Sequence, residues 1–183
     1  REEIDAEGKL LMPGVIDPQV HFREPGGTEK EDLASGSRAA VRGGVTSFLE
    51  MPNCNPPTIN QEQMDWKISR GRTTSVANFG FFIGATVDNL ESLNNVHPTC
   101  GIKIFMGSST GSLLVDDPKV LAEVLKRANR RIAVHCEDEA RLTERRPLVE
   151  VEGCSVSQHP VWRDDQTAYI ATERLLDTAR KTG

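Results

Sequence analysis

The stretch LLMPGVIDPQVHFREPG (residues 10–26) sets the structural pattern of the chain. An apolar run, interrupted by one Pro-Gly pair, leads directly into a polar cluster that contains His21 and Arg23. A short apolar run that ends in turn-forming residues is typical of a buried strand. We therefore predict a strand over residues 10–20 whose carboxyl end carries these two side chains.

The pattern recurs in the rest of the chain. Further apolar runs rich in strand-forming residues cover residues 45–51, 76–85, 101–106 and 131–135. The spacing of apolar residues between and after them predicts helices, and Asp32 and Asp117 are placed to start two of these. The expected helices cover residues 32–42, 61–69, 90–93, 118–128 and 166–181, and residues 140–159 are expected to form a helix broken by Pro147 and a loop. Strands that alternate with helices and are apolar on both faces indicate parallel βα units.

Two features favour a barrel over an open sheet. No Gly-x-Gly-x-x-Gly or Walker motif follows any predicted strand, so a nucleotide-binding sheet has no positive support. Polar residues follow strand after strand, as catalytic residues do in (β/α)8 barrels; they are His21, Arg23, Asn53, residues 108–110 and His135. A complete (β/α)8 TIM barrel takes about 250 residues, so 183 residues with five strands are expected to form roughly its N-terminal half. Because an isolated half has two unpaired sheet edges, we expect further strands to close the barrel in the intact protein.

Composition argues against two classes of partner. The formal charge of -5 and the lack of a long basic block disfavour nucleic acid. The longest apolar run, residues 79–85, is far shorter than the roughly 20 residues that cross a bilayer, and the first residues form no signal-peptide pattern. We therefore expect a cytoplasmic protein with no membrane segment. The four cysteines are widely spaced, so neither a zinc knuckle nor a disulfide framework is expected.

His21 is the first candidate metal ligand. It lies two residues after Gln19, so in a strand the two side chains point to the same face. Neutral imidazole binds zinc well, whereas a glutamine amide oxygen is a weak ligand. The alternative is a structural or solvated histidine. Arg23 lies in the loop that follows, where its guanidinium either binds a ligand carboxylate or pairs locally with Glu24.

Lys103 and His135 are the other two candidates. Lys103 lies in GIKIFM, where every neighbour is apolar, and burying an unpaired ammonium is costly. Its side chain therefore either reaches the strand edge or loses its proton, becoming a nucleophile or taking up carbon dioxide as a carbamate ligand. His135, in IAVHCEDE, either ligates a metal with support from Glu137 and Asp138 or is a satisfied core residue.

Four motifs in order give the chain a family resemblance. They are MPGVIDPQVHFREPG, GGVTSFLEMPNCNPPT, GIKIFMGSSTG and IAVHCEDE, which begin at residues 12, 43, 101 and 132. Together they resemble the dihydroorotases of the cyclic amidohydrolase superfamily over nearly the whole chain. The Arg of REPG together with the Asn of MPN favours dihydroorotase over the hydantoinase and allantoinase members.

The resemblance implies an α/β fold, an amidohydrolase-type TIM barrel with zinc at its C-terminal mouth. The implied reaction is the reversible cyclisation of N-carbamoyl-L-aspartate to dihydroorotate in pyrimidine synthesis. Residues 1–11 are then expected to be the tail of a small flanking β domain, and residues 12–183 part of the catalytic barrel. The family's catalytic aspartate and a further histidine ligand are expected beyond Gly183, so this segment alone is expected to be inactive.

The resemblance also assigns roles to individual residues. It makes His21 and His135 zinc ligands and Lys103 a carbamylated bridging ligand. It makes Arg23 and Asn53 the groups that hold the substrate carboxylate. These roles depend on the match between motifs and not on spacing alone.

The sequence departs from the family at Gln19, which stands where the family usually has the first histidine of a His-x-His pair. Loss of that imidazole leaves three alternatives: a single metal ion, a second ion held weakly, or an impaired homologue. We rank a working enzyme with one or two zinc ions first, because the matching residues Arg23, Asn53, Lys103 and His135 are all retained.

Three functions therefore compete. The first is a zinc-dependent dihydroorotase, with a small-molecule substrate and either a second copy of the chain or aspartate transcarbamoylase as protein partner. The second is a non-catalytic dihydroorotase-like subunit kept for such an assembly. The third is another cyclic amidohydrolase of the hydantoinase or allantoinase type.

Overall fold

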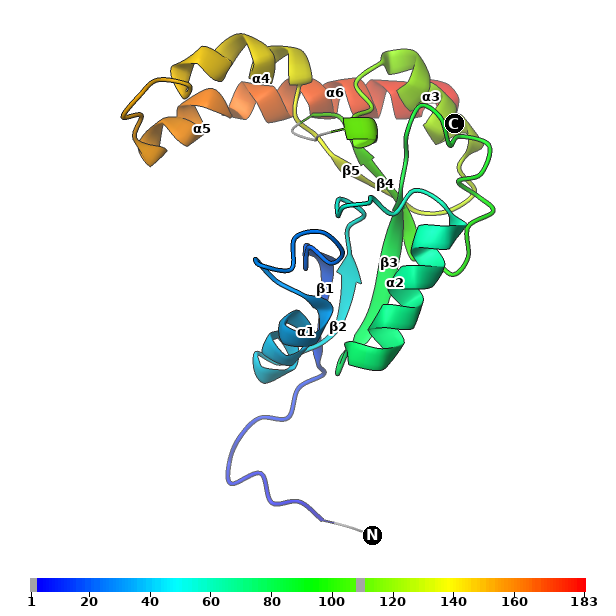
Figure 1. Cartoon of the computed structure of the whole chain (residues 1–183), viewed down its shortest axis with the longest axis vertical. Helices are drawn as coiled ribbons and strands as arrows, with labels where there is room; N and C mark the ends of the chain where they lie inside the picture. Colours follow the sequence, from blue (N-terminus) through cyan, green and yellow to red (C-terminus); the bar gives the residue numbers. More distant parts are fainter. Residues whose placement is uncertain (1–2, 108–110) are drawn as a thin grey trace.

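The computed structural model describes residues 3–107 and 111–183 and contains one parallel sheet. The strands are β1 (Val15–Val20), β2 (Val45–Glu50), β3 (Asn78–Gly84), β4 (Gly101–Phe105) and β5 (Ile132–His135). They are hydrogen-bonded in chain order, each parallel to the next. The sheet curls like part of a barrel wall, with the helices along one of its faces (Figure 1). The predicted fold, roughly half of a (β/α)8 barrel, is confirmed.

Helices connect the strands and extend beyond β5. The α-helices are α1 (Leu33–Arg42), α2 (Gln61–Thr74), α3 (Pro118–Arg127), α4 (Glu139–Arg145), α5 (His159–Trp162) and α6 (Asp165–Thr182). The 3-10 helices are η1 (Gly111–Leu113), η2 (Arg146–Leu148) and η3 (Val156–Gln158). Figure 1 shows α4 and α5 projecting past the sheet and the N-terminal residues leading away from it. None of the described helices is long and apolar enough to cross a membrane.

Two helices begin where the sequence predicts, because their caps supply the missing hydrogen bonds. The Asp32 side chain accepts a hydrogen bond from the backbone N–H of Ser35 at 2.7 Å, and the Ser35 hydroxyl oxygen accepts one from the backbone N–H of Asp32. The Asp117 side chain caps α3 by accepting from the backbone N–H of Lys119 at 2.7 Å, with Pro118 in the first turn. Such caps satisfy backbone donors that a helix start leaves free.

Three predicted elements differ in the structure. Residues 10–14 form no strand, because their Pro-Gly pair weakens strand pairing, and β1 starts at Val15. Residues 90–93 form a turn in place of a helix. There the side chain of Asn89 bonds to three backbone groups before the turn, and such bonds compete with helix formation. Helix α2 runs on to Thr74, beyond its predicted end.

The core lies between the sheet and its helices. Every residue of β4 is buried, and the fully buried side chains around it include Leu33, Phe48, Met64, Phe81, Ile83, Leu121 and Val124. Burying each such side chain contributes about 1.5–3 kcal/mol. The β1 edge differs, because Val15 and Ile16 are 57% and 63% exposed. The stable part of this segment is therefore centred on β3 and β4.

A group of charged residues, which we call the Lys67 cluster, comprises the buried Glu24, Glu50 and Lys67 and the partly exposed Arg70. Lys67 of α2 and Glu50 at the end of β2 are each 1% exposed, and their Nζ and Oε2 atoms lie 2.5 Å apart. Lys67 Nζ also donates to the backbone carbonyl of Glu24 at 2.8 Å. The Glu24 carboxylate accepts from the N–H of Leu33 at 2.8 Å and pairs with Arg70 at 2.5 Å. The cluster therefore joins the loop after β1, the end of β2, and helices α1 and α2.

We predict that Lys67→Met lowers the free energy of unfolding by about 3–5 kcal/mol, because Glu50 would stay buried without its partner. Urea unfolding of the intact protein measures the change. Lys126 on α3 is exposed, so Lys126→Met is the matched control and should cost less than about 0.5 kcal/mol. The double variant Glu50→Leu/Lys67→Met should lose less stability than Lys67→Met alone. An equal or larger loss would contradict the role of the unpaired charge.

Candidate active site

Most of the predicted site residues lie at the carboxyl ends of the strands. His21 directly follows β1, Asn53 follows β2, Lys103 lies within β4, and His135 ends β5. Parallel strands present their carboxyl ends at one rim, where barrel enzymes place their chemistry. The predicted polar loop at residues 108–110 lies outside the described residues.

Asn53 holds His21. Its Oδ1 atom lies 2.7 Å from Nδ1 of the imidazole. An amide oxygen only accepts hydrogen bonds, so Nδ1 carries the hydrogen and Nε2 is bare. Asn53 is predicted to bind a carboxylate, and its NH2 group is the part left to do so.

The electrostatics place further cations close to His21. Burial lowers the pKa of His21, and the hydrogen bond that His21 donates to Asn53 opposes this shift. Electrostatic interactions with Arg23, Lys103 and His135 lower that pKa further. Groups from three different segments therefore act electrostatically on one imidazole.

Lys103 is inside the protein. It is 1% exposed, which excludes the alternative that its side chain reaches solvent at the strand edge. Burial lowers its pKa, with Cys136 opposing, and Nζ lies 4.9 Å from the centre of the Phe105 ring. Within the described ranges no acidic side chain forms an ion pair with it. A buried amine in this setting favours its neutral form, which is the form that reacts with carbon dioxide.

His135 is bound to a carboxylate. Its Nε2 atom lies 2.5 Å from Oε2 of Glu137, and Arg163 donates from Nε to the other Glu137 oxygen at 2.8 Å. Burial raises the pKa of Glu137, but hydrogen bonds from Arg163 and His135 outweigh it and hold that pKa below its usual value. Glu137 thus lies where the sequence predicts a supporting carboxylate. Asp138 does not share this role, because it caps α4 and pairs with Arg174 at 2.5 Å.

Arg23 occupies a turn that leaves its guanidinium available. Its φ is 61°, in the left-handed region. Glu24 pairs with Arg70, and among the described residues no ion pair joins Glu24 to Arg23. The turn packs against the loop that carries Asn53, since Pro25 O accepts from the N–H of Asn55 at 3.0 Å. Of the two predicted roles for Arg23, the structure excludes the local ion pair.

The donor set for a metal contains two histidines and a lysine. The described residues hold no group of three His, Cys, Asp or Glu side chains arranged for a metal. His21 Nε2, His135 Nδ1 and a carbamate on Lys103 would nonetheless make three donors, the number that a catalytic zinc site takes from protein. The residues present therefore fit a zinc ion. Gln19 is exposed in β1, next to a shift in the pairing register with β2. That the side chains of Gln19 and His21 point to the same face stays a prediction.

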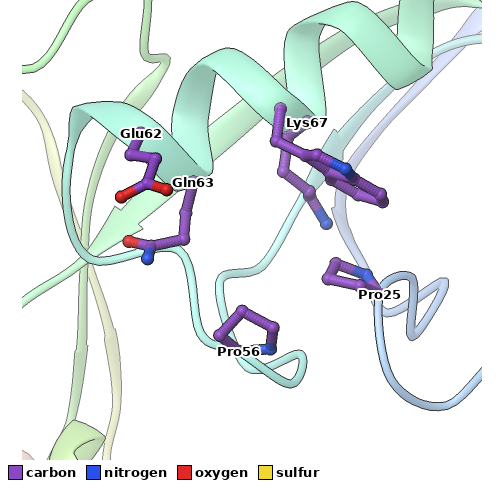
Figure 2. Close-up of a pocket in the computed structure, with 6 residues that line it drawn as sticks. Pro25, Pro56, Glu62, Gln63 and Lys67 are labelled. Carbon is purple, nitrogen blue, oxygen red and sulfur yellow. The ribbon is translucent and has the colours of Figure 1, made fainter.

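One pocket lies away from this rim. It has a volume of about 180 Å³ and is lined by Pro25, Pro56, Glu62, Gln63, Trp66 and Lys67. Figure 2 shows the two prolines facing α2 across the pocket, with the Lys67 side chain reaching toward them. None of the predicted site residues lines it. It belongs to the packing of two loops on α2.

Sequence reasoning missed the side chains that support the site. Lys67 offers a weak signal, because it stands between Trp66 and Ile68 in a helix. Arg163 gives none, because it lies 26 residues from Glu137 without a connecting pattern. Contacts of this kind are visible only after folding.

The comparison with known families decides membership. A family model described as dihydro-orotase-like matches residues 8–146. The chain belongs to this dihydroorotase-like family. The match spans all four motifs, so the predicted resemblance is confirmed.

Curated relatives carry two different names. A dihydroorotase from Methanosarcina mazei is 38% identical over 185 residues, covering 98% of this chain and 40% of that protein. An allantoinase from Rubrobacter xylanophilus is also 38% identical, over 146 residues that cover 75% of this chain and 32% of that protein. The dihydroorotase-like chain thus spans about two fifths or less of the length of these relatives.

Solved structures support the fold. An L-hydantoinase (dihydropyrimidinase) from Arthrobacter aurescens superposes with a TM-score of 0.88 at 24% identity, covering 98% of this chain and 42% of that one. A D-hydantoinase from Bacillus sp. AR9 gives a TM-score of 0.82 at 26% identity, covering 100% of this chain and 42% of that one. The dihydroorotase-like chain therefore has the fold of the corresponding part of the hydantoinases.

Acidification is predicted to destabilise the metal-free protein through His21. The folded state holds the pKa of His21 below its usual 6.5, so the unfolded chain takes up a proton that the folded protein resists. This contribution to stability is complete above about pH 6.5 and is lost as the pH falls toward the lowered pKa. His21→Asn should therefore flatten the fall in unfolding free energy between about pH 7.5 and about pH 5. The exposed His159 provides the control: His159→Asn should keep the wild-type slope, and a wild-type slope in His21→Asn would contradict the assignment.

Proposed function

We propose that the intact protein is a zinc-dependent dihydroorotase that interconverts N-carbamoyl-L-aspartate and dihydroorotate in pyrimidine synthesis. This chain would supply one wall of the active site. The observation that carries the proposal is Lys103, a buried lysine without an acidic partner among the described residues, on the rim that also holds His21 and His135. A dihydroorotase 38% identical over 185 residues supports it.

His21, His135 and carbamylated Lys103 would hold the metal, as one or two ions depending on the part played by Gln19. When bound, the metal supplies Lewis acidity at the amide carbonyl and an activated water. The remaining work falls to the chain. Asn53 orients the His21 ring through its hydrogen bond, and Glu137 does the same for His135.

Arg23 distinguishes the proposed substrate from those of related enzymes. Its guanidinium has no carboxylate partner within the described ranges, and a planar fork of donors suits a substrate carboxylate. Dihydroorotate and N-carbamoyl-L-aspartate carry such a group, whereas hydantoin and allantoin rings do not. The NH2 group of Asn53, which comes from the neighbouring loop, would share the same carboxylate.

A second candidate is another cyclic amidohydrolase, favoured by the allantoinase that is also 38% identical. A non-catalytic subunit is the third. For either a catalytic or a non-catalytic protein, the proposed assembly partner is a second copy or aspartate transcarbamoylase.

The first test is metal content and dihydroorotate hydrolysis by the intact protein, compared with Lys103→Ala. We expect the wild type to bind zinc and Lys103→Ala to lose it. The variant's kcat/KM should fall by at least about 1,000-fold, which corresponds to about 4 kcal/mol of transition-state stabilisation. Lys126→Ala, at an exposed position, should behave as wild type. A Lys103→Ala protein that keeps its zinc and turnover refutes the carbamate role. A wild type fully loaded with zinc but without turnover supports the non-catalytic alternative.

The second test separates substrates. We predict that Arg23→Gln lowers kcat/KM for dihydroorotate by about 10–100-fold, the loss expected for a hydrogen-bonded charge. Its effect on dihydrouracil, the same ring without the carboxylate, should be small. Arg38→Gln, at an exposed position on α1, is the control. Equal losses on both rings would mean that Arg23 supports the structure of the site and does not bind the substrate carboxylate. If the wild type opens allantoin faster than dihydroorotate, the second candidate is favoured.

A further inference from the structure

Arg163 reaches the rim from outside the barrel strands. It lies between α5 and α6, and its guanidinium contacts both oxygens of Glu137, with Nε 2.8 Å from Oε1. The Glu137 carboxylate in turn lies 2.5 Å from Nε2 of His135. The side chains of Glu137 and Arg163 are only 12% and 25% exposed. A continuous set of contacts therefore leads from a segment near α6 to the histidine at the end of β5.

The chain on both sides of Arg163 is anchored. Trp162 donates from Nε1 to the carbonyl of Leu142 at 2.8 Å, and Arg145 donates to the carbonyl of Trp162 at 3.2 Å. On the other side Asp164 caps α6 through the N–H of Thr167 at 3.1 Å. The Trp162 ring lies 5.9 Å from the Arg163 guanidinium carbon. The direction of this guanidinium is thus set by α4 and α6 together.

The chemistry of the three groups determines where the imidazole hydrogen lies. A carboxylate held by two guanidinium contacts is ionised and can only accept hydrogen bonds. Nε2 of His135 must then be the donor, and in a neutral imidazole the other nitrogen, Nδ1, is bare. No hydrogen bond to Nδ1 is present in the described part of the chain.

We infer that Arg163 is a positioning residue that, through Glu137, locks His135 in the tautomer with hydrogen on Nε2 and a bare Nδ1. His21 is in the opposite state, because Asn53 keeps hydrogen on its Nδ1 and leaves Nε2 bare. Each neighbour therefore selects which nitrogen its histidine presents. The tautomer itself does not depend on the proposed function, whereas its consequence, stronger zinc binding through Nδ1, does.

The first experiment measures zinc affinity of the intact protein by competition with a chromophoric chelator. Arg163→Gln and the isosteric Glu137→Gln should each weaken zinc binding by about 10–100-fold, the effect typical of groups that orient metal ligands. Arg163→Lys keeps the charge but not the fork, so its loss should be smaller. Arg146→Gln is the matched control, since Arg146 is exposed and pairs only with Glu150 among the described residues, at 3.8 Å. Thermal unfolding of each variant shows whether it is folded.

The second experiment reads the tautomer in metal-free protein labelled with 15N-histidine, with the His135 signals assigned by their loss in His135→Asn. The wild type should show hydrogen on Nε2, and Arg163→Gln a mixture of the two tautomers. Hydrogen on Nδ1 in the wild type, or an unchanged tautomer in both Arg163→Gln and Glu137→Gln, overturns the inference. A wild type that binds no zinc contradicts the proposed function, and the tautomer then decides the inference alone. Tight zinc binding that Arg163→Gln leaves unaltered overturns the inference and leaves the proposed function in place.

Discussion

The buried ion pair between Lys67 and Glu50 is the constraint on which the rim of this half-barrel depends. Both side chains are 1% exposed, and burying either charge without the other would be strongly destabilising. Lys67 also holds the carbonyl of Glu24, so the same ammonium spans the end of β2 and the loop after β1. That loop carries Arg23, and β2 leads to Asn53. The charge of Lys67 in α2 therefore helps to fix how the segments that carry Arg23 and Asn53 lie against each other.

The rim lacks free acidic side chains among the described residues, although the chain as a whole carries a formal charge of -5. Arg23, Lys103 and His135 all lower the pKa of His21, and the acidic residues nearby are engaged elsewhere. Glu24 is bound to Arg70, and Glu137 to Arg163. A rim whose acidic side chains are already paired is suited to negative groups, such as the proposed carbamate on Lys103 and the proposed substrate carboxylate.

The two histidines show how a fold built from repeated βα units makes its strand ends chemically different. Each follows its strand in the same way, yet one imidazole meets an amide oxygen and the other a carboxylate. The partners come from different distances along the chain: Asn53 from the next βα unit, Arg163 from a segment near α6. Each of these neighbours fixes the orientation of one imidazole ring.

The sequence by itself determined the order of strands and helices, the caps at Asp32 and Asp117, and the set of polar residues at the strand ends. These depend on local hydrophobic spacing, capping chemistry and the direction of parallel strands, all of which are written in neighbouring residues. The turn at residues 90–93 was mispredicted because the side chain of Asn89 bonds to backbone that the sequence does not show to be close.

Only the tertiary structure decided what each polar residue contacts. It buries Lys103 away from solvent, and it pairs Glu24 with Arg70 and not with Arg23. It also brings Arg163 into contact with Glu137, 26 residues away in the sequence. The physical reason is that ion pairing and desolvation depend on which groups lie close in space. The sequence contains many side chains of each type, and it does not show which of them will become partners.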